Sequence, residues 1–318
     1  MIRHVLSRGL QSLAVLLVMS FVVYGLMGLM PGDPIDLMIA ADPRLTPEDA
    51  LRLKALYGLD QPWTERYGRW LAQVAQGELG YSRLYARPVL DALWPALGNT
   101  VVLMLAALAV ALLLAIPLGI AASLRPNSPF DHAVNLLAFA SVSLPTFWLG
   151  LMLIVVFAVH LGWLPASGMV DVTGGGGLAD RLAHMALPVA TLALAGMGQY
   201  VRHMRAAMIG EAHHDYVRTA RAKGCSPRRI VLRHQLRNAL IPVTTILALE
   251  VGGLFSGALI TETVFAWPGM GRLIFEAVMG NDFNLALSGL LLATAMTLVG
   301  SILADLAYAA LDRRVSYR

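Results

Sequence analysis

Long stretches without charge constrain this chain more than any other feature of its sequence. A helix that crosses a lipid bilayer needs about 20 mostly apolar residues. Only 14% of the residues are charged and 57% are apolar. Soluble domains carry roughly 25% charged and 45–50% apolar residues, so lipid must cover the excess here. The sequence therefore predicts an all-α polytopic membrane protein with six transmembrane helices, near 10–30, 99–123, 133–161, 183–201, 239–261 and 285–311.

The first apolar stretch is expected to stay in the mature protein. It is longer than the roughly 7–15 residues of a signal-peptide core, and no small-x-small cleavage site follows it. We therefore assign 1–30 to an N-terminal cytoplasmic segment and the first transmembrane helix, and 31–98 to an outer helical loop. The remaining 99–318 form a core of five transmembrane helices, which contains the loop 202–238.

The distribution of lysine and arginine sets the expected orientation. Segments on the cytoplasmic side of a membrane carry an excess of these residues. With both termini inside, the inner segments hold 15 of the 24 basic residues. Seven of the other nine lie in the long loop 31–98, where the rule counts least. Both termini and the loop 202–238 are therefore expected in the cytoplasm.

The outer loop 31–98 is expected to contain two helices. One covers 46–58, where Thr46 provides a cap and Pro47 occupies the first helical position. The other covers 64–76 and has an aromatic face that suits the membrane–water interface. This face either packs as a lid over the spans or docks a soluble partner, and both interpretations stay open. Its members are Trp63, Tyr67, Trp70 and Leu71.

The sequence offers no sign of an enzyme. A phosphate-binding loop of the form G-x-x-x-x-G-K-[S/T] is absent, because the only lysines, Lys54 and Lys223, are followed by Ala and Gly. Gly269 and Gly271 lack a dinucleotide fingerprint and are expected to form a re-entrant turn near the outer surface. Cys225 is the only cysteine, so no disulfide within the chain and no cysteine metal cluster can form. Any energy from ATP must therefore come from another subunit.

The basic loop 202–238 shows more local order than membrane topology demands. Asp215 is expected to cap a short helix, Tyr216 to Lys223, which Gly224 ends in a left-handed conformation. Topology and binding to anionic lipid explain the charge of the loop, but they do not explain a short capped helix with interleaved alanines. The next helix is expected to begin with Ser226 as its cap and Pro227, and to carry one stripe of Arg229, Arg233 and Arg237.

This loop resembles the coupling segment of permease subunits of binding-protein-dependent ABC importers. The wider superfamily has the pattern Glu-Ala-Ala-x3-Gly-x9-Ile-x-Leu-Pro, and Ala220, Gly224 and Leu236 match it. The other positions differ in the way typical of the dipeptide/oligopeptide/nickel branch. The differing residues are Arg218, Thr219, His234 and Arg237.

The resemblance to this branch extends over nearly the whole chain. The similar segments identify the family, but they do not distinguish between the substrates of its members. The similar segments are Pro31-Gly-Asp-Pro34, Gly58-Leu-Asp-Gln-Pro62, Arg87-Pro-Val89, Ser143-Leu-Pro-Thr-Phe-Trp148, Gly162-Trp-Leu-Pro165, Asp215-Tyr-Val-Arg-Thr-Ala-Arg-Ala-Lys-Gly224, Leu236-Arg-Asn-Ala-Leu-Ile-Pro242, Glu262-Thr-Val-Phe-Ala-Trp-Pro-Gly269 and Leu311-Asp-Arg313.

The resemblance implies the type I ABC importer permease fold and a set of partners. In this family two related permeases form the membrane core, two cytoplasmic ATPases bind ATP and Mg, and a periplasmic or lipid-anchored protein delivers the solute. The chain itself would hold no cofactor or metal, bind no nucleic acid, and lie in the bacterial inner membrane. The implied ATPase-coupling residues are Asp215, Tyr216, Arg218, Thr219, Ala220, Arg221, Ala222, Lys223 and Gly224.

The resemblance implies different roles for the small and the basic residues of this coupling helix. The small side chains of Ala220 and Ala222 would allow close approach to a cleft in one ATPase. The basic side chains would pair with acidic groups at the rim of that cleft. These basic residues are Arg218, Arg221 and Lys223.

The implied function is import of dipeptides or short oligopeptides, and nickel or metal-chelate complexes and glutathione stay open as substrates. Glu250 lies mid-span, where a charge is costly; it either lines the solute path or pairs with the partner permease. A secondary cation-coupled transporter would use Glu250 as its ion site, but no inverted repeat is evident. Asp305 is expected to be structural, and His213 and His214 to be polar residues at a helix end.

Overall fold

The chain is almost entirely helical in the computed structural model, which describes residues 2–29, 48, 52, 61–171, 176–251 and 258–311. Side chains are placed for 7–29, 48, 52, 61–171, 176–247 and 258–304. In this part of the chain the only sheet is a pair of two-residue strands, β1 (Tyr81–Ser82) and β2 (Arg87–Pro88), which run antiparallel. Of the helix expected over 46–58 only residues 48 and 52 are described, both helical, and the rest lies outside the described residues.

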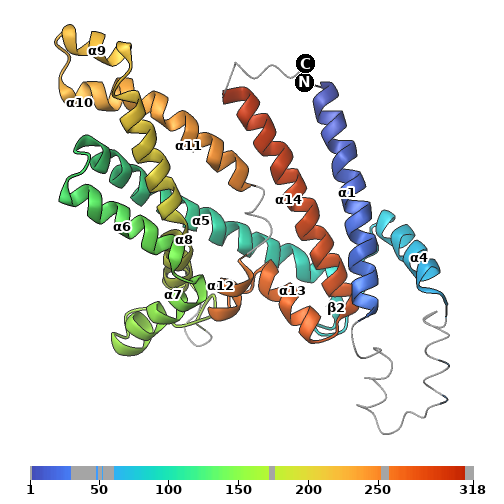
Figure 1. The fold of residues 1–318 in the computed structure, drawn as a ribbon. Helices are drawn as coiled ribbons and strands as arrows, with labels where there is room; N and C mark the ends of the chain where they lie inside the picture. Colours follow the sequence, from blue (N-terminus) through green and yellow to red (C-terminus); the bar gives the residue numbers. More distant parts are fainter. Residues whose placement is uncertain are drawn as a thin grey trace.

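Most of the helices follow one another with short connections, and longer segments separate α1 from α4 and η1 from α8 (Figure 1). Two segments, η1 and η2, are π-helical. The helical elements are α1 (Ile2–Gly28), α4 (Trp63–Ala75), α5 (Val89–Leu124), α6 (Pro129–Ser143), α7 (Thr146–Leu153), η1 (Ile154–His160), α8 (Leu178–Glu211), α9 (Asp215–Ala222), α10 (Pro227–Arg229), η2 (Ile230–Gln235), α11 (Leu236–Val251), α12 (Leu259–Val264), α13 (Met270–Met279) and α14 (Phe283–Leu311).

Four helices in the described part of the chain are long and apolar enough to cross a membrane by themselves. They correspond to the predicted first, second, fourth and sixth spans. The α8 helix extends beyond its predicted span to Glu211. The four segments are Ser7–Gly28, Val89–Leu124, Leu178–Glu211 and Phe283–Ala304.

The third predicted span, 133–161, is not one straight helix. It consists of α6 and then α7 with η1, which meet at an angle of 104°. Pro145 causes the break, because it has no N–H to bond the Ser141 carbonyl and it disfavours helical backbone at Leu144. Leu144 is indeed extended, with φ −78° and ψ 128°. Counted as one bent span, this pair brings the number of candidate spans to five.

The fifth predicted span, 239–261, is described only in part. Its first section is α11, and its last residues belong to α12. Residues 252–257, between these two helices, lie outside the described part. The expected total of six spans therefore stays a prediction.

The spans α5 and α8 pack against each other through small residues. The main contact is between α5 and α8, and α6 and α11 also pack against α8. A Cβ added to Gly119 on α5 would lie 2.8 Å from the Met204 Cβ and 2.9 Å from the Val201 carbonyl. Glycine and alanine let the backbones approach this closely, which is how helices associate in lipid. The buried alanines of α5 include Ala107, Ala111, Ala115 and Ala122.

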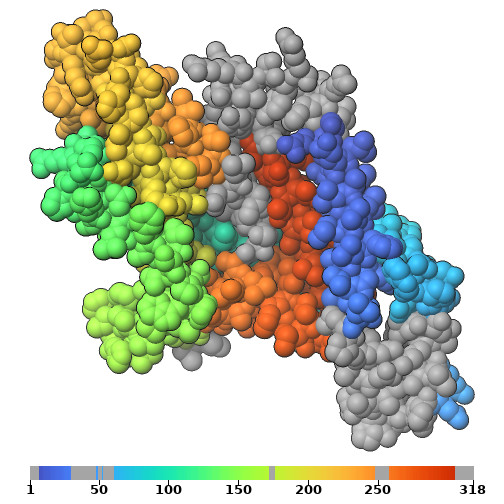
Figure 2. Space-filling view, viewed as in Figure 1, coloured from blue at the N-terminus to red at the C-terminus, as the bar shows by residue number. Residues whose placement is uncertain are grey.

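The two ends of the molecule differ in their elements. The start of α1 and the end of α14 lie at the same end as α9 and α10, and α12, α13 and the two strands lie at the other (Figure 1). The space-filling view shows α9 and α10 as a protrusion at one corner, and α7 with η1 as a second protrusion at the opposite end (Figure 2). The chain therefore presents a separate projecting element at each end.

The second predicted outer-loop helix is α4, and it packs onto the spans of its own chain. Tyr67 stacks edge-on against Tyr24 of α1, and its hydroxyl lies 2.8 Å from that of Ser20. Trp70 is buried in the same cluster, beside Tyr24 and Leu287. The inner face of α4 therefore forms a lid over α1 and α14, one of the two interpretations of this aromatic face.

Candidate coupling site

The short helix α9 projects from the C-terminal end of α8 and ends in a defined backbone motif. Gly224 follows it with a φ of +74°. The Gly224 amide donates to the Arg221 carbonyl at 2.9 Å, and the Cys225 amide donates to the Ala220 carbonyl at 3.1 Å. These two bonds and a left-handed glycine constitute a Schellman motif. The predicted helix end at Gly224 is confirmed.

The start of α9 differs from the prediction by one residue. His214 occupies the N-cap position, and Asp215 is the first helical residue. The Asp215 carboxylate makes no capping bond; it is almost fully exposed and lies 3.4 Å from the Arg218 guanidinium. A negative charge in the first turn still favours the helix through its dipole. Ser226 does sit at the N-cap of α10, with Pro227 after it, but its hydroxyl makes no capping bond either.

One face of α9 is buried against its own chain. Val217 and Ala220 are buried and pack against Ile230 of η2, with Cys225 beside them. This small cluster anchors α9 to the segment that follows it and fixes the angle at which α9 projects. Ala220 therefore points inward, and the expectation that it offers close approach to a partner is corrected. Ala222 is exposed and keeps that possibility.

Tyr216 links α9 back to α8. Its hydroxyl donates to the Glu211 carboxylate at the end of α8. Burial, and then this hydrogen bond, raise the pKa of the Tyr216 hydroxyl above its usual range. The Tyr216 side chain therefore connects α9 to the end of α8. Because it is half-buried, it is only partly available to a partner.

The outward face of α9 is strongly basic. Arg218, Arg221 and Lys223 are exposed there, together with Thr219. Asp215 is the one acidic residue among the described positions 213–237. This face therefore carries a local excess of positive charge. Farther along the chain, Arg228, Arg229, Arg233 and Arg237 are exposed as well.

The predicted stripe of arginines at α-helical spacing is interrupted. Between Arg229 and Arg237 the chain is π-helical, and the Leu236 amide donates to the Val231 carbonyl five residues earlier. A π-turn holds more residues than an α-turn, so positions four apart no longer lie directly above one another. The arginines are exposed, but the π-helical segment removes the alignment that a straight stripe requires.

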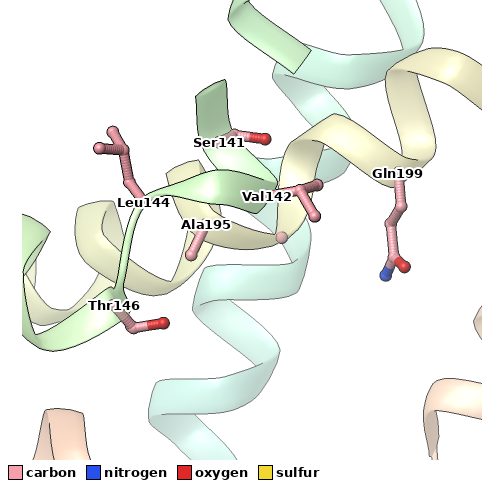
Figure 3. A pocket seen from close by; sticks show the side chains of 7 residues that line it. Ser141, Val142, Leu144, Thr146, Ala195 and Gln199 are labelled. Carbon is pink, nitrogen blue, oxygen red and sulfur yellow. The ribbon is translucent and has the colours of Figure 1, made fainter. Parts of the chain in front are cut away.

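A shallow cavity of about 220 Å³ lies beside the break between α6 and α7 (Figure 3). The hydroxyls of Ser141 and Thr146 and the amide of Gln199 surround it (Figure 3). Prediction from the sequence missed this site, although the Pro145 that creates the break was visible. The lining residues are Ser141, Val142, Leu144, Thr146, Ala195, Gly196 and Gln199.

The residue expected to line the solute path, Glu250, is in the backbone of α11, but its side chain lies outside the described residues. The same holds for the side chain of Asp305 in α14. His213 is exposed at the end of α8 and contacts the Ile209 carbonyl at 2.9 Å. His214 stacks against Tyr216. Both histidines are helix-end residues, as expected.

The predicted outer turn at Gly269 and Gly271 surrounds a buried carboxylate. Glu262 is fully buried and accepts hydrogen bonds from the Thr100 hydroxyl at 2.7 Å and the Arg272 amide at 3.1 Å. A Cβ on Gly269 would lie 2.4 Å from this carboxylate, and one on Gly271 would lie 2.6 Å from the Leu259 backbone. The glycines are therefore present because the turn closes tightly on Glu262, which caps α13.

Comparison with known proteins covers the whole chain. Residues 115–317 match the model of the family described as "Binding-protein-dependent transport system inner membrane component". Residues 1–101 match the model of the N-terminal region of such membrane components. The two matches include both α9 and the outer loop.

Full-length relatives are also similar. The chain is 35% identical over 318 residues to the oligopeptide transport system permease protein AppB of Bacillus subtilis, covering 100% of both chains. It is 37% identical over 316 residues to a putative peptide permease protein of Brucella suis, covering 99% of both. It is 34% identical over 320 residues to the dipeptide transport system permease protein DppB of Escherichia coli, covering 94% of both. The chain belongs to the family of inner membrane components of binding-protein-dependent transport systems.

Proposed function

We propose that this chain is the membrane-spanning permease subunit of an ABC importer and forms the path for dipeptides or short oligopeptides. The observation that carries this proposal is α9, a short helix with a basic outward face that projects beyond the spans on a Schellman turn. The similarity to peptide permeases along the full length of the chain supports the substrate class. Nothing in the sequence supplies a nucleotide site, so the ATPase is a separate subunit.

The partners in this proposal are a second permease, two cytoplasmic ATPases that bind ATP and Mg, and an external solute-binding protein. The exposed Arg218, Arg221 and Lys223 would pair with acidic side chains around a cleft in one ATPase. Ala222 would let the backbone of α9 approach the floor of that cleft. The buried Val217 and Ala220 would keep α9 attached to its own chain during the movement.

The orientation in this proposal follows from the position of α9. The end of the molecule that carries α9 and α10 would lie in the cytoplasm, together with the start of α1 and the end of α14 (Figure 1). The lysine and arginine distribution supports this orientation. The strands, α12 and α13 would then face the solute-binding protein.

The solute path would run along the break between α6 and α7. Irregular backbone at membrane depth is tolerated only where it is buried in protein or lines a water-filled cavity. The cavity at Ser141, Thr146 and Gln199 provides such a place, with polar groups that suit the amides of a peptide backbone. Glu250 belongs to the same proposal as a second lining residue.

The experiment is reconstitution of the chain with its cognate partner subunits in proteoliposomes. Uptake of a labelled dipeptide should require the ATPases, ATP and the binding protein, and the chain alone should be inert under any ion gradient. Transport by the chain alone under an ion gradient would identify a secondary carrier and overturn the proposal. The ligand that co-purifies with the binding protein, identified by mass spectrometry, decides between peptides, glutathione and metal chelates.

A further inference from the structure

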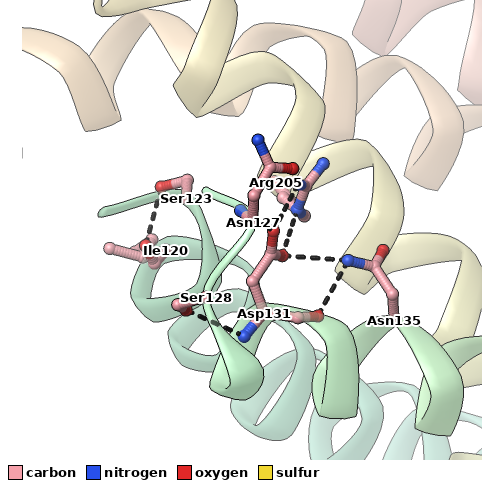
Figure 4. Close-up of polar contacts among 7 residues, drawn as sticks. All are labelled: Ile120, Ser123, Asn127, Ser128, Asp131, Asn135 and Arg205. Carbon is pink, nitrogen blue, oxygen red and sulfur yellow. Dashed lines mark hydrogen bonds and ion pairs between the residues drawn. The ribbon is translucent and has the colours of Figure 1, made fainter. Parts of the chain in front are cut away.

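Asp131 and Arg205 form an ion pair that joins α6 to α8 (Figure 4). The Arg205 Nε lies 2.5 Å from Oδ1 of Asp131, and its Nη2 lies 2.6 Å from Oδ2. The Asp131 residue is 1% exposed. A bidentate guanidinium–carboxylate pair fixes direction as well as distance, because two parallel bonds prevent rotation.

The remaining positions on the carboxylate are also occupied. The backbone amide of Asn127 donates to Oδ2 at 2.9 Å, and the side-chain amide of Asn135 donates to Oδ1 at 2.9 Å. Each oxygen of Asp131 therefore accepts two hydrogen bonds. The Ser128 hydroxyl accepts from the Asp131 amide at 3.2 Å and caps α6. The pair is thus held in place from the α5–α6 turn as well as from α8.

A second contact joins the same two helices farther from the α9 end. A Cβ on Gly198 of α8 would lie 2.1 Å from the Ser141 hydroxyl and 2.2 Å from the Ala138 carbonyl of α6. Ser141 lies about 15 Å along α6 from Asp131, at 1.5 Å per residue. A helix held at one point can pivot about it, whereas a helix held at two separated points moves with its partner.

We propose that Asp131 and Arg205 are positioning residues for transport, which make α6 and the inner part of α8 one rigid lever. This inference rests on the proposed function. A displacement of α9 by an ATPase then travels through α8 to α6 and reaches the break at Ser143–Thr146. Without the ion pair, α6 keeps the apolar packing of Val134 and Ala138 on α8 but loses the polar anchor near its first turn. Less of the movement then reaches the break.

The geometry favours bending at the break over bending elsewhere in α6. Pro145 removes one helical hydrogen bond, and Leu144 is already extended. The cavity lies directly beside this break, and Ala195, Gly196 and Gln199 of α8 form its other wall (Figure 3). A rigid movement of α6 with α8 therefore changes the shape of the cavity through α7.

The test uses the complete importer in proteoliposomes, with peptide uptake and ATP hydrolysis measured in the same sample. Asp131→Asn keeps the shape of the side chain and removes its charge. We expect peptide uptake per ATP hydrolysed to fall by about fivefold or more, the lower range of measured allosteric couplings, while ATP hydrolysis continues. The matched control is His203→Gln, since His203 is exposed on the same helix and makes no contact with α6 among the described hydrogen bonds and ion pairs. Its uptake per ATP should stay at the wild-type value.

A structural role alone predicts another outcome. If Asp131→Asn lowers only the amount or thermal stability of the importer and leaves uptake per ATP unchanged, the proposal is overturned. Arg205→Lys retains the charge but loses the bidentate geometry, so it too should lower uptake per ATP.

A cross-linking variant decides the matter if Asp131→Asn does not assemble. In Asp131→Cys/Arg205→Cys/Cys225→Ser, a short thiol cross-linker should restore uptake per ATP by restoring rigidity without charge. A cross-linked importer that hydrolyses ATP but stays uncoupled would overturn the proposal. Absence of peptide uptake by the wild-type importer, in contrast, is a failure of the proposed function itself.

Discussion

The Thr100 hydroxyl donates a hydrogen bond to the Glu262 carboxylate at 2.7 Å and joins two segments 162 residues apart. The same hydroxyl accepts from the Met270 amide at 2.8 Å, at the first residue of α13. One side chain of α5 therefore fixes both the buried carboxylate and the start of the next helix. The turn between α12 and α13 is held to α5 through this contact.

Thr100→Val should destabilise the protein. The substitution leaves the buried Met270 amide without its acceptor and Glu262 without one donor, and an unpaired buried polar group costs about 1–3 kcal/mol. The loss is measured as a lower midpoint of thermal unfolding in detergent. Thr64→Val, at an exposed position of α4, is the control and should leave the midpoint unchanged. Equal midpoints for Thr100→Val and the wild type would contradict this account of the turn.

Gly198→Ala should separate α6 from α8. The added Cβ would meet the Ala138 carbonyl at 2.2 Å, and backbone cannot move aside as a side chain can. Overpacking of this kind costs about 1–3 kcal/mol. Gly196→Ala is a control from the same helix, since its Cβ would meet nothing within 4 Å. Thermal unfolding of the two variants should differ clearly, and equal stability would mean that the helices are not in such close contact.

Gly224→Val should impair coupling more than folding. Its Cβ would meet nothing within 4 Å, so the penalty is backbone strain at φ +74°, about 1–2 kcal/mol. The strain falls on the Schellman turn and changes the angle of α9. We expect normal membrane insertion, with lower peptide uptake and lower uptake-linked ATP hydrolysis.

Two further substitutions control the Gly224 experiment. Gly224→Asn should retain part of the activity, because Asn tolerates the left-handed region. Gly210→Ala, within α8 and with open space for its Cβ, should behave as wild type. Full peptide uptake by Gly224→Val would argue against the role assigned to α9.

Tyr85 should make the stability of the contact between the β1–β2 turn and α13 depend on alkaline pH. Burial, and then its hydrogen bond to the Glu276 carboxylate, raise the pKa of Tyr85 from 10.0 to about 12. A raised pKa stabilises the fold while the hydroxyl is protonated in both states. This contribution is complete below pH 10 and is lost as the pH rises toward about 12.

The measurement is the difference in unfolding midpoint between wild type and Tyr85→Phe as a function of pH. The difference should be constant up to about pH 10 and shrink between about pH 10 and 12. Tyr81→Phe is the control, because the Tyr81 hydroxyl donates to the Ala86 carbonyl and faces no carboxylate partner among the described hydrogen bonds. A difference that stays constant through pH 12 would contradict the assignment.

Local features of the candidate site were predictable from the sequence. Gly224 after a run of helix-forming residues specifies an end, and Pro227 specifies a beginning. The face of α9 was not predictable, because the sequence shows only that Ala220 and Ala222 are small. Which of them is buried depends on Ile230, which packs against α9 only after the turn at Gly224 has formed.

The Asp131–Arg205 pair could not be predicted from the sequence either, because its two residues lie far apart in the chain. Arg205 belongs to the basic run that topology explains, and Asp131 follows a capping serine, so each residue had a sufficient local explanation. The two residues are 74 positions apart in the sequence, and the packing of α6 on α8 brings them together. No local pattern in either segment indicates the other.

The sequence by itself determined four apolar spans, the basic loop and the C-terminal end of its short helix, because hydrophobic length, charge distribution and capping are properties of adjacent residues. The tertiary structure decided the bend of the third span, the inward face of α9, and the pairing of Asp131 with Arg205 and of Thr100 with Glu262. Each of these depends on which helices lie against each other. Their contacts come from residues far apart in the chain, whose distances are fixed only when the spans have packed.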